Sequence, residues 1–257
     1  MRNLFKYIGI SAVLVFSFYY TEKMSNIVIN NSSLVNEINE NVNNYNIQAV
    51  SALIDGDYII PGLNGSTVNV LKSYNNMKFL DTFNSYYLVY DKTVPMVSLE
   101  NNKDKIIKRG NSSKESVSII VKDNQEIIDY SLQKNIEITR LININTFNKS
   151  VSYEQINFDV ENYKKVESLL NNSNLNNNIC FINNKNNCDN SEKYLVESTV
   201  TLTNYNLGNI KSDIKSGYII FINDDVSVTD YKILIRQIYY QDLDIISLSK
   251  LITEERD

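Results

Sequence analysis

Short apolar runs and stretches of helical spacing alternate through the second half of the sequence. Segments that read as strands lie at 117–121, 136–142, 179–182, 218–222 and 245–248, and the first is mostly apolar, as expected of a strand buried on both faces. The stretches with helical spacing lie at 125–133, 158–170 and 228–240. Such repeated strand–helix units predict an α/β domain over residues 115–252, built on a parallel sheet or a (β/α) barrel.

The helix predicted at 228–240 has the clearest pattern, because its large apolar side chains recur at helical spacing. They are Tyr231, Leu234, Ile235 and Ile238. We expect this stripe to pack against the sheet, and a short helix over 249–252 to end the domain.

The segment before residue 115 has a different pattern, and residues 47–112 read as a small α+β module. Its strands are expected around two turn signals, Asp55-Gly56 and Asn64-Gly65. A further strand, a helix and another strand are expected at 67–70, 71–80 and 86–90. Three of the seven glycines fall between Gly56 and Gly65. They predict tight turns with positive φ, with a ligand-binding loop as the alternative.

The first residues have the pattern of a membrane-targeting segment. Arg2 and Lys6 precede an uncharged run of 14 residues, Tyr7 to Tyr20, which is short against the roughly 20 residues of a spanning helix. We expect an uncleaved signal anchor over residues 1–24; a cleaved signal peptide and a soluble buried helix are the alternatives. The positive-inside rule then makes this a single-pass protein of the cell membrane with its bulk outside the cell. A helical stalk over residues 25–46 would follow the anchor.

Composition excludes several classes of chemistry. Histidine is absent, so the chain has no histidine-dependent nucleophile, no His-ligated metal site and no histidine general base. The 25 Lys and Arg residues are outnumbered by 30 Asp and Glu residues, and the net charge of -5 offers no basic field to nucleic acid. About 40 of the 257 residues are Asn, a usage typical of an AT-rich genome.

The two cysteines, Cys180 and Cys188, are 8 residues apart. In an oxidising compartment they are close enough in sequence to form a disulfide. Two unpaired thiols, with Cys180 buried in a strand, are an equal alternative. Two cysteines without any histidine do not indicate a metal site.

Ligand-binding groups of parallel α/β folds lie at the carboxyl ends of the strands. The polar residues at those ends are Lys122, Asp123, Asn124, Asn143, Asn183, Asn223, Asp224 and Asp225. Lys122 and Asp123 form either a salt-bridged or solvated strand end, or part of a sugar-binding cleft. Asp224 and Asp225 could bind calcium, but capping of the following helix, by one of them or by Ser227, is the favoured interpretation.

The ends of this domain resemble those of the polysaccharide deacetylase family, metal-dependent carbohydrate esterases on a distorted (β/α) barrel. The family opens with V-A-L-T-F-D-D-G, and residues 117–124 (V-S-I-I-V-K-D-N) take that place. It closes with G-x-I-I-L-x-H-D and a last strand and helix, which residues 217–224 (G-Y-I-I-F-I-N-D) and 242–252 resemble. The resemblance covers about 115–252 and implies a trimmed, distorted (β/α) barrel. The membrane helix and the α+β module, which both precede this domain, look like the anchored extensions of some bacterial members of the family.

The departures from the family fall on the residues that carry its chemistry. Lys122 stands where the family has its catalytic base, and Asp123 stands where it has a metal-binding aspartate. The other two ligands are histidines, and the general acid is a histidine whose place Asn223 takes. An Asn side chain exchanges no proton near neutral pH, and one carboxylate does not hold a catalytic zinc. We therefore expect no catalytic residue, no metal and no cofactor.

Together these observations predict a membrane-anchored, envelope-facing protein that is not an enzyme. It would bind cell-wall glycan or an envelope protein, with Asp123, Asn223, Asp224 and Asp225 as the candidate binding residues. One alternative is an active polysaccharide deacetylase, which hydrolyses the amide bonds of N-acetylated glycans. Another is a purely structural scaffold of the envelope.

Overall fold

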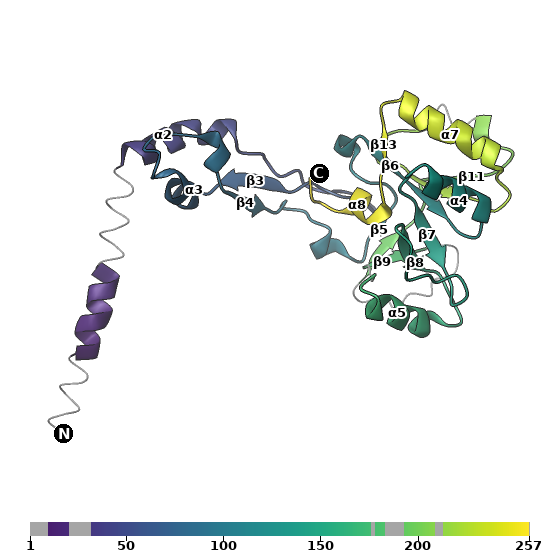
Figure 1. Ribbon diagram of the computed structural model, residues 1–257, viewed down its shortest axis with the longest axis horizontal. Helices are drawn as coiled ribbons and strands as arrows, with labels where there is room; N and C mark the ends of the chain where they lie inside the picture. Colours follow the sequence, from purple (N-terminus) through teal and green to yellow (C-terminus); the bar gives the residue numbers. More distant parts are fainter. Residues whose placement is uncertain (1–9, 21–31, 176–177, 183–192, 209–212, 257) are drawn as a thin grey trace, which may run out of the picture. The chain divides into compact units, whose positions relative to one another are not determined.

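The computed structural model describes residues 10–20, 32–175, 178–182, 193–208 and 213–256 (Figure 1). The chain divides into two compact units. Unit 1 comprises residues 1–48 and 65–93, and unit 2 comprises residues 49–64 and 94–257.

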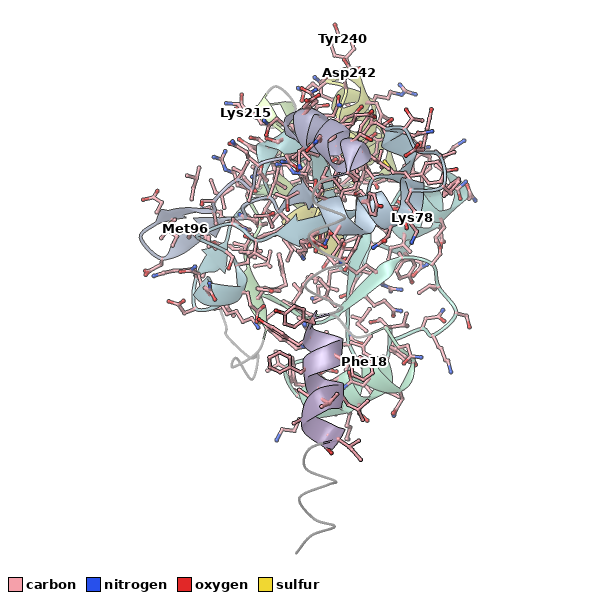
Figure 2. All side chains as sticks on the ribbon, turned by 90° about the vertical axis from the view of Figure 1, so that its left-hand side faces the viewer. Phe18, Lys78, Met96, Lys215, Tyr240 and Asp242 are labelled. Carbon is pink, nitrogen blue, oxygen red and sulfur yellow. The ribbon has the colours of Figure 1, made fainter. Side chains whose placement is uncertain are left out.

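Residues 10–20 are helical, and their apolar side chains are exposed. Phe18, which Figure 2 labels on this helix, is 75% exposed. In the part of the chain that the structure describes, no helix is both long and apolar enough to span a bilayer. The predicted anchor also includes residues 1–9 and 21–24, which lie outside the described residues.

Besides the helix at residues 10–20, the described part of unit 1 combines two short helices, α2 (Ser33–Asn41) and α3 (Val70–Met77), with a two-stranded antiparallel sheet. The other described elements are η1 (Val42–Asn44), β3 (Gly65–Val68), η2 (Ser85–Tyr87) and β4 (Tyr90–Thr93). Side-chain caps begin both helices, with Ser32 accepting from the N–H of Val35 and Asn69 from that of Lys72. The core contains Leu34, Ile38, Val68 and Met77. The helix predicted as a stalk therefore contributes two side chains to a folded core.

Unit 2 contains two sheets. The larger is parallel, in the order β11–β12–β6–β7–β8, with β13 added on β6. Its strands are β6 (Ser116–Val121), β7 (Thr139–Ile142), β8 (Glu154–Asn157), β11 (Val200–Leu202), β12 (Ile219–Ile222) and β13 (Asp244–Ile245). The second sheet has the order β1–β2–β5–β10–β9. Its strands are β1 (Leu53–Asp55), β2 (Tyr58–Ile60), β5 (Ile106–Ile107), β9 (Ile179–Phe181) and β10 (Tyr194–Val196), and the 3-10 turns η3 (Glu100–Asn102) and η4 (Ser112–Lys114) flank β5.

The two sheets share one buried interior. Strand β8 lies beside β9, and inward side chains from both sheets form one cluster, which includes Ile120, Leu141, Ile156, Phe181, Val196 and Ile219. Helix α8 (Leu248–Ile252) closes this interior with Leu248 and Leu251. No ladder joins β8 to β9 within the described residues, so the strands form an incomplete, barrel-like layer.

Helices α4 (Gln125–Gln133), α5 (Tyr163–Asn172) and α7 (Val228–Tyr240) cover the outer face of the larger sheet in the part of the chain that the structure describes. Helices α4 and α7 lie side by side against β6 and β12 (Figure 1). Helix α5 packs Val166 and Leu170 against Ile142 of β7. The predicted stripe on α7 is confirmed, because its four residues, Tyr231, Leu234, Ile235 and Ile238, are all buried.

The unit boundaries differ from those that the sequence predicts. Residues 47–112 do not form a module of their own, because 65–93 belong to unit 1 and the remainder belongs almost entirely to unit 2. The reason is non-local pairing. The hairpin β1–β2 pairs with β5, and β5 pairs in turn with β10, which follows some 90 residues later in the chain.

Several predicted elements also change. Residues 85–87 form η2 and the strand follows as β4, whereas a strand was expected at 86–90. Strand β8 was not expected, and α5 begins at Tyr163 rather than at Phe158. Of the clustered glycines, Gly56 has the expected positive φ of 58° in the β1–β2 turn. Gly62 is required for a different reason, because a Cβ there would clash with the carbonyl oxygen of Val50.

Candidate functional site at the carboxyl ends of the strands

The carboxyl ends of β6 and β12 are neighbours in the parallel sheet. Val121 is in register with Ile222, so the residues that follow these strands leave the sheet side by side. The backbone N–H of Asp123 donates to Oδ1 of Asp224 over 3.4 Å. The structure thus brings together Asp123 and Asp224, two of the residues that the sequence singles out.

Lys122 lies on the same face of β6 as Ile120, the face that points to the shared interior. Ile120 faces the shared interior, and alternate residues of a strand share a face. The Nζ atom of Lys122 lies 3.5 Å from Oδ2 of Asp123 and 5.8 Å from the centroid of the Phe158 ring. Both partners of the ion pair remain open to solvent, with side chains 37% and 41% exposed.

Three phenylalanine rings lie on the same inward rows, and Phe158 among them is the ring that Lys122 approaches. The ring centroids of Phe158 and Phe181 are 6.4 Å apart, and those of Phe181 and Phe221 are 5.8 Å apart. The sequence analysis missed them as site residues, although each comes two positions after an inward isoleucine of its strand. We call the three rings, together with Lys122, Asp123 and Asp224, the barrel mouth.

Asn223 and Asp225 turn toward the end of β11. Nδ2 of Asn223 donates to Oδ1 of Asp225 over 3.0 Å, and the N–H of Asn204 approaches the other carboxylate oxygen at 3.5 Å. Helix α7 is capped by Ser227, whose hydroxyl accepts from the N–H of Asp230. Neither Asp224 nor Asp225 is therefore the cap.

The remaining predicted positions serve local structure where they are described. Asn124 caps α4 through Ile127, and its Nδ2 donates to the carbonyl of Val226 over 2.9 Å. Asn143 accepts from the N–H groups of the two residues that follow Ile144, so it forms a turn. Asn183 lies outside the described residues.

Asp159 is a carboxylate at the same barrel end that the sequence analysis did not identify. It follows β8 and is 8% exposed. Its two oxygens accept from the backbone N–H groups of Ile144, Glu161 and Asn162, at 2.9, 3.0 and 2.7 Å. Burial by itself would raise the pKa of Asp159, but these donors outweigh it and hold the pKa below its ordinary value of 3.8. The acceptor positions of this carboxylate are therefore used by backbone N–H groups of its own loop and of the loop after β7.

The barrel mouth does not fit a catalytic metal ion. Within the described residues, no group of three or more Cys, Asp or Glu side chains could hold a metal, and the sequence has no histidine. The Lys122 ammonium beside Asp123 also places a positive charge where the ion would have to sit. We therefore derive no reaction step through a metal.

Cys180 lies on β9 and is buried and disulfide-bonded. Cys188, the other cysteine of the sequence, lies outside the described residues.

Comparison with known sequences gives one partial match. No protein family model matches the chain. The uncharacterized protein YlxY of Bacillus subtilis (strain 168) is 34% identical over 89 residues, which make up 34% of this chain and 28% of that relative. The match thus spans less than a third of the relative's length.

Comparison with solved structures covers most of the chain. A CE4 family pseudoenzyme from Bacillus anthracis has a TM-score of 0.54 at 18% identity, over 87% of this chain and 96% of the other. A mutant of that pseudoenzyme with restored enzymatic activity has the same TM-score at 19% identity, over 87% and 99%. At this identity the likeness concerns the fold alone, and it shows that the chain is a mixed α/β protein whose fold is similar to that of a CE4 family pseudoenzyme.

Proposed function

We propose that this protein is a non-catalytic, deacetylase-like glycan-binding protein, held at the cell membrane by its N-terminal segment with its bulk outside the cell. The barrel mouth is its binding surface. The solved CE4 protein with a similar fold is itself described as a pseudoenzyme, which supports a role without catalysis. The two parts of the proposal, binding without catalysis and the membrane anchor, have separate tests.

The observation that carries the proposal is the Lys122–Asp123 ion pair, whose lysine lies near the ring of Phe158. Hydrolysis of an amide needs a base and an acid, or a metal-bound water. The Asn223 side chain forms hydrogen bonds but cannot transfer a proton as a general acid. The ammonium of Lys122 lies 3.5 Å from the carboxylate that would have to bind the metal. These features of the mouth support binding of a ligand without its chemical transformation.

The chemistry of the mouth suits a sugar. The partly exposed rings of Phe158 and Phe221 have faces of negative partial charge, which attract the C–H groups on one face of a pyranose ring, while Phe181, 6% exposed, packs against both. Lys122 donates hydrogen bonds, while the carboxylates of Asp123 and Asp224 accept them from hydroxyl groups. Phe158 contributes a partly exposed ring, which makes it the residue to change.

Binding is tested by titrating N-acetylated chitooligomers into the full chain in detergent. Phe158→Leu keeps an apolar side chain but removes the ring, and we expect affinity to fall roughly three- to tenfold. Tyr240→Ala is the matched control. Tyr240 is 84% exposed at the end of α7, and Figure 2 shows it projecting from the surface. Equal affinity of the two variants would contradict binding at the mouth.

Catalysis is tested by incubating the same oligomers with the chain and Zn²⁺ or Co²⁺. We expect no release of acetate. Acetate release that disappears in Asp123→Ala would establish the active deacetylase instead. Absence of any glycan binding, with co-purification of an envelope protein, would establish the scaffold.

The anchor rests on the exposed apolar side chains of residues 10–20 and on the basic residues Arg2 and Lys6 before them. Sequencing the amino terminus of the mature protein tests it. We expect the intact terminus in the membrane fraction, and a terminus near residue 25 would refute an uncleaved anchor.

A further inference from the structure

A cavity of about 400 Å³ opens at the opposite end of the strands from the barrel mouth. It lies between the carboxyl end of α4, the amino ends of β7 and β8, and the start of α8. Its lining includes Leu132, Ile136, Glu137, Tyr153, Glu154 and Lys250. We call it the Glu137–Lys250 pocket. Its volume falls in the range of about 300–1,000 Å³ that is usual for small-molecule sites.

One side of this pocket is a charged rim. Nζ of Lys250 lies 2.8 and 3.0 Å from the two carboxylate oxygens of Glu137. The N–H of Ser247 donates to the same carboxylate over 3.1 Å. The side chains of the ion pair are about half exposed, so both charges remain within reach of a ligand.

Glu154 supplies an acceptor with spare capacity. Its Oε2 accepts from the hydroxyl of Thr139 over 2.7 Å and from the N–H of Ser249 over 3.3 Å. Its Oε1 receives no hydrogen bond from the part of the chain that the structure describes. Because an ionised carboxylate offers about four acceptor positions, the pocket presents more acceptors than its own donors occupy.

The lining of the pocket also contains apolar side chains. Among them Ile136 and Tyr153 are each 8% exposed, and Leu132 is 40% exposed. A ligand that fills this pocket must therefore cover apolar surface and satisfy carboxylate acceptors at the same time.

These requirements select the class of ligand. A phosphate or carboxylate ligand would meet two glutamates and one lysine, so its net interaction would be repulsive. A purely apolar ligand would strip water from Glu137 and Glu154 without replacing their hydrogen bonds. A polyhydroxylated ring has an apolar C–H face, hydroxyl donors for the glutamates and acceptor oxygens for Lys250. We propose that the Glu137–Lys250 pocket is a second binding site, which takes a sugar unit and is independent of the barrel mouth.

The test exploits the absence of tryptophan from the sequence. Leu132→Trp places a single tryptophan at the edge of the pocket, and Ile233→Trp places one at a position of matched exposure on α7. Leu132 and Ile233 are 40% and 38% exposed, and Ile233 is not part of the pocket lining. On titration of the full chain with chitotetraose, we expect a saturable change in tryptophan emission in the Leu132→Trp variant alone. No change, or an equal change in both variants, would overturn the proposal.

The charged rim is tested in the same assay, with calorimetry on the tryptophan-free chain as a second measurement. Lys250→Gln removes the ammonium, and Glu137→Gln keeps an acceptor oxygen but removes the charge. Because this ion pair is half exposed, both variants should fold. We expect Lys250→Gln to weaken binding at the pocket about tenfold. Unchanged affinity in both variants would contradict the assignment.

Two further arms separate the sources of the result. The free-amine oligomer, chitosan tetramer, should bind more tightly than chitotetraose, because its ammonium groups pair with Glu154. Weaker binding would count against the role of this carboxylate.

The mouth variant Phe158→Leu, combined with Leu132→Trp, should leave the emission change at the pocket as it is. If Phe158→Leu abolishes that change, the pocket is not an independent site, whereas the proposed function at the mouth would stand.

Discussion

Two aspartates follow strands at the same end of the barrel, and their surroundings differ completely. Asp159, after β8, is buried and accepts three backbone N–H groups, two from its own loop and one from Ile144 in the loop after β7. Asp123, after β6, keeps 41% of its side chain exposed and faces Lys122 at 3.5 Å. A carboxylate at a strand end is therefore not a binding group by its position alone. What matters is whether the backbone around it has already used its acceptor capacity.

The two kinds of loop therefore differ in role, one structural and the other open to solvent. The loop with Asp159 is held together by its carboxylate, so it provides a fixed edge beside Phe158. The loops with Asp123 and Asp224 keep their charges near solvent, where a ligand can reach them. Four changes test this division, and they are ordered here by the size of the expected effect.

The largest effect should come from Asp159→Ala. Removing this carboxylate leaves three backbone N–H groups without their acceptor, and we expect a loss of about 3 kcal/mol in the free energy of unfolding. Asp123→Ala is the matched control, with an expected loss of less than about 0.5 kcal/mol. Urea denaturation measures both. Similar losses in the two variants would remove the distinction between the loops.

The second largest effect should come from acid, which reduces the contribution of Asp159 to the free energy of unfolding. Its folded pKa lies below the ordinary value of 3.8, so its stabilisation is fully present above that value and is lost as the pH falls through the folded pKa. We therefore expect the stability difference between the native chain and Asp159→Asn to be constant above about pH 5 and to shrink below about pH 4. Asp91 and Glu100 also have lowered pKa values, but they titrate in both proteins and cancel in the difference. A difference that grows on acidification would contradict the assignment.

A smaller effect is expected from Asn124→Ala, next to Asp123. Asn124 caps α4 and also ties its loop to the carbonyl of Val226 before α7. Loss of the cap and of this hydrogen bond should cost about 1–2 kcal/mol, measured by urea denaturation. Asn124 would thus stabilise the loop, while the neighbouring Asp123 would be available to bind a ligand. A loss below about 0.5 kcal/mol would show that the loop is held by other contacts.

The sequence was sufficient for the elements with strong periodicity. Strand β6 is a mostly apolar run, and α7 carries its buried stripe at helical spacing, so both were predicted close to their observed bounds. Strand β8 was missed because it has a single aliphatic residue, Ile156, between polar ones. Its Gln155 and Asn157 are nevertheless buried, since Gln155 bonds to the carbonyl of Asn148 in the preceding loop and Asn157 to the carbonyl of Tyr163 in α5, and no sequence periodicity reveals such partners.

The same limit explains the candidate site. The polar residues after β6 and β12 were identified because parallel strands place their carboxyl ends together. Phe158 was assigned to a helix once β8 had been missed, so the group of three phenylalanine rings could not be assembled from the sequence. The Glu137–Lys250 pocket depends on contact between residues 113 positions apart, which adjacency in the chain does not predict.

The smallest change in stability should come from Lys122→Gln, and it bears most directly on function. The ion pair with Asp123 is partly exposed, so its removal should cost at most about 0.5 kcal/mol, and less still in 1 M salt, where charges are screened. Urea denaturation at low and high salt measures this cost. A loss above about 1.5 kcal/mol would mean that Lys122 holds the fold as Asp159 does. A near-zero loss, combined with weaker binding of N-acetylated chitooligomers, would mean that the charge near the Phe158 ring serves a ligand and contributes little to the structure.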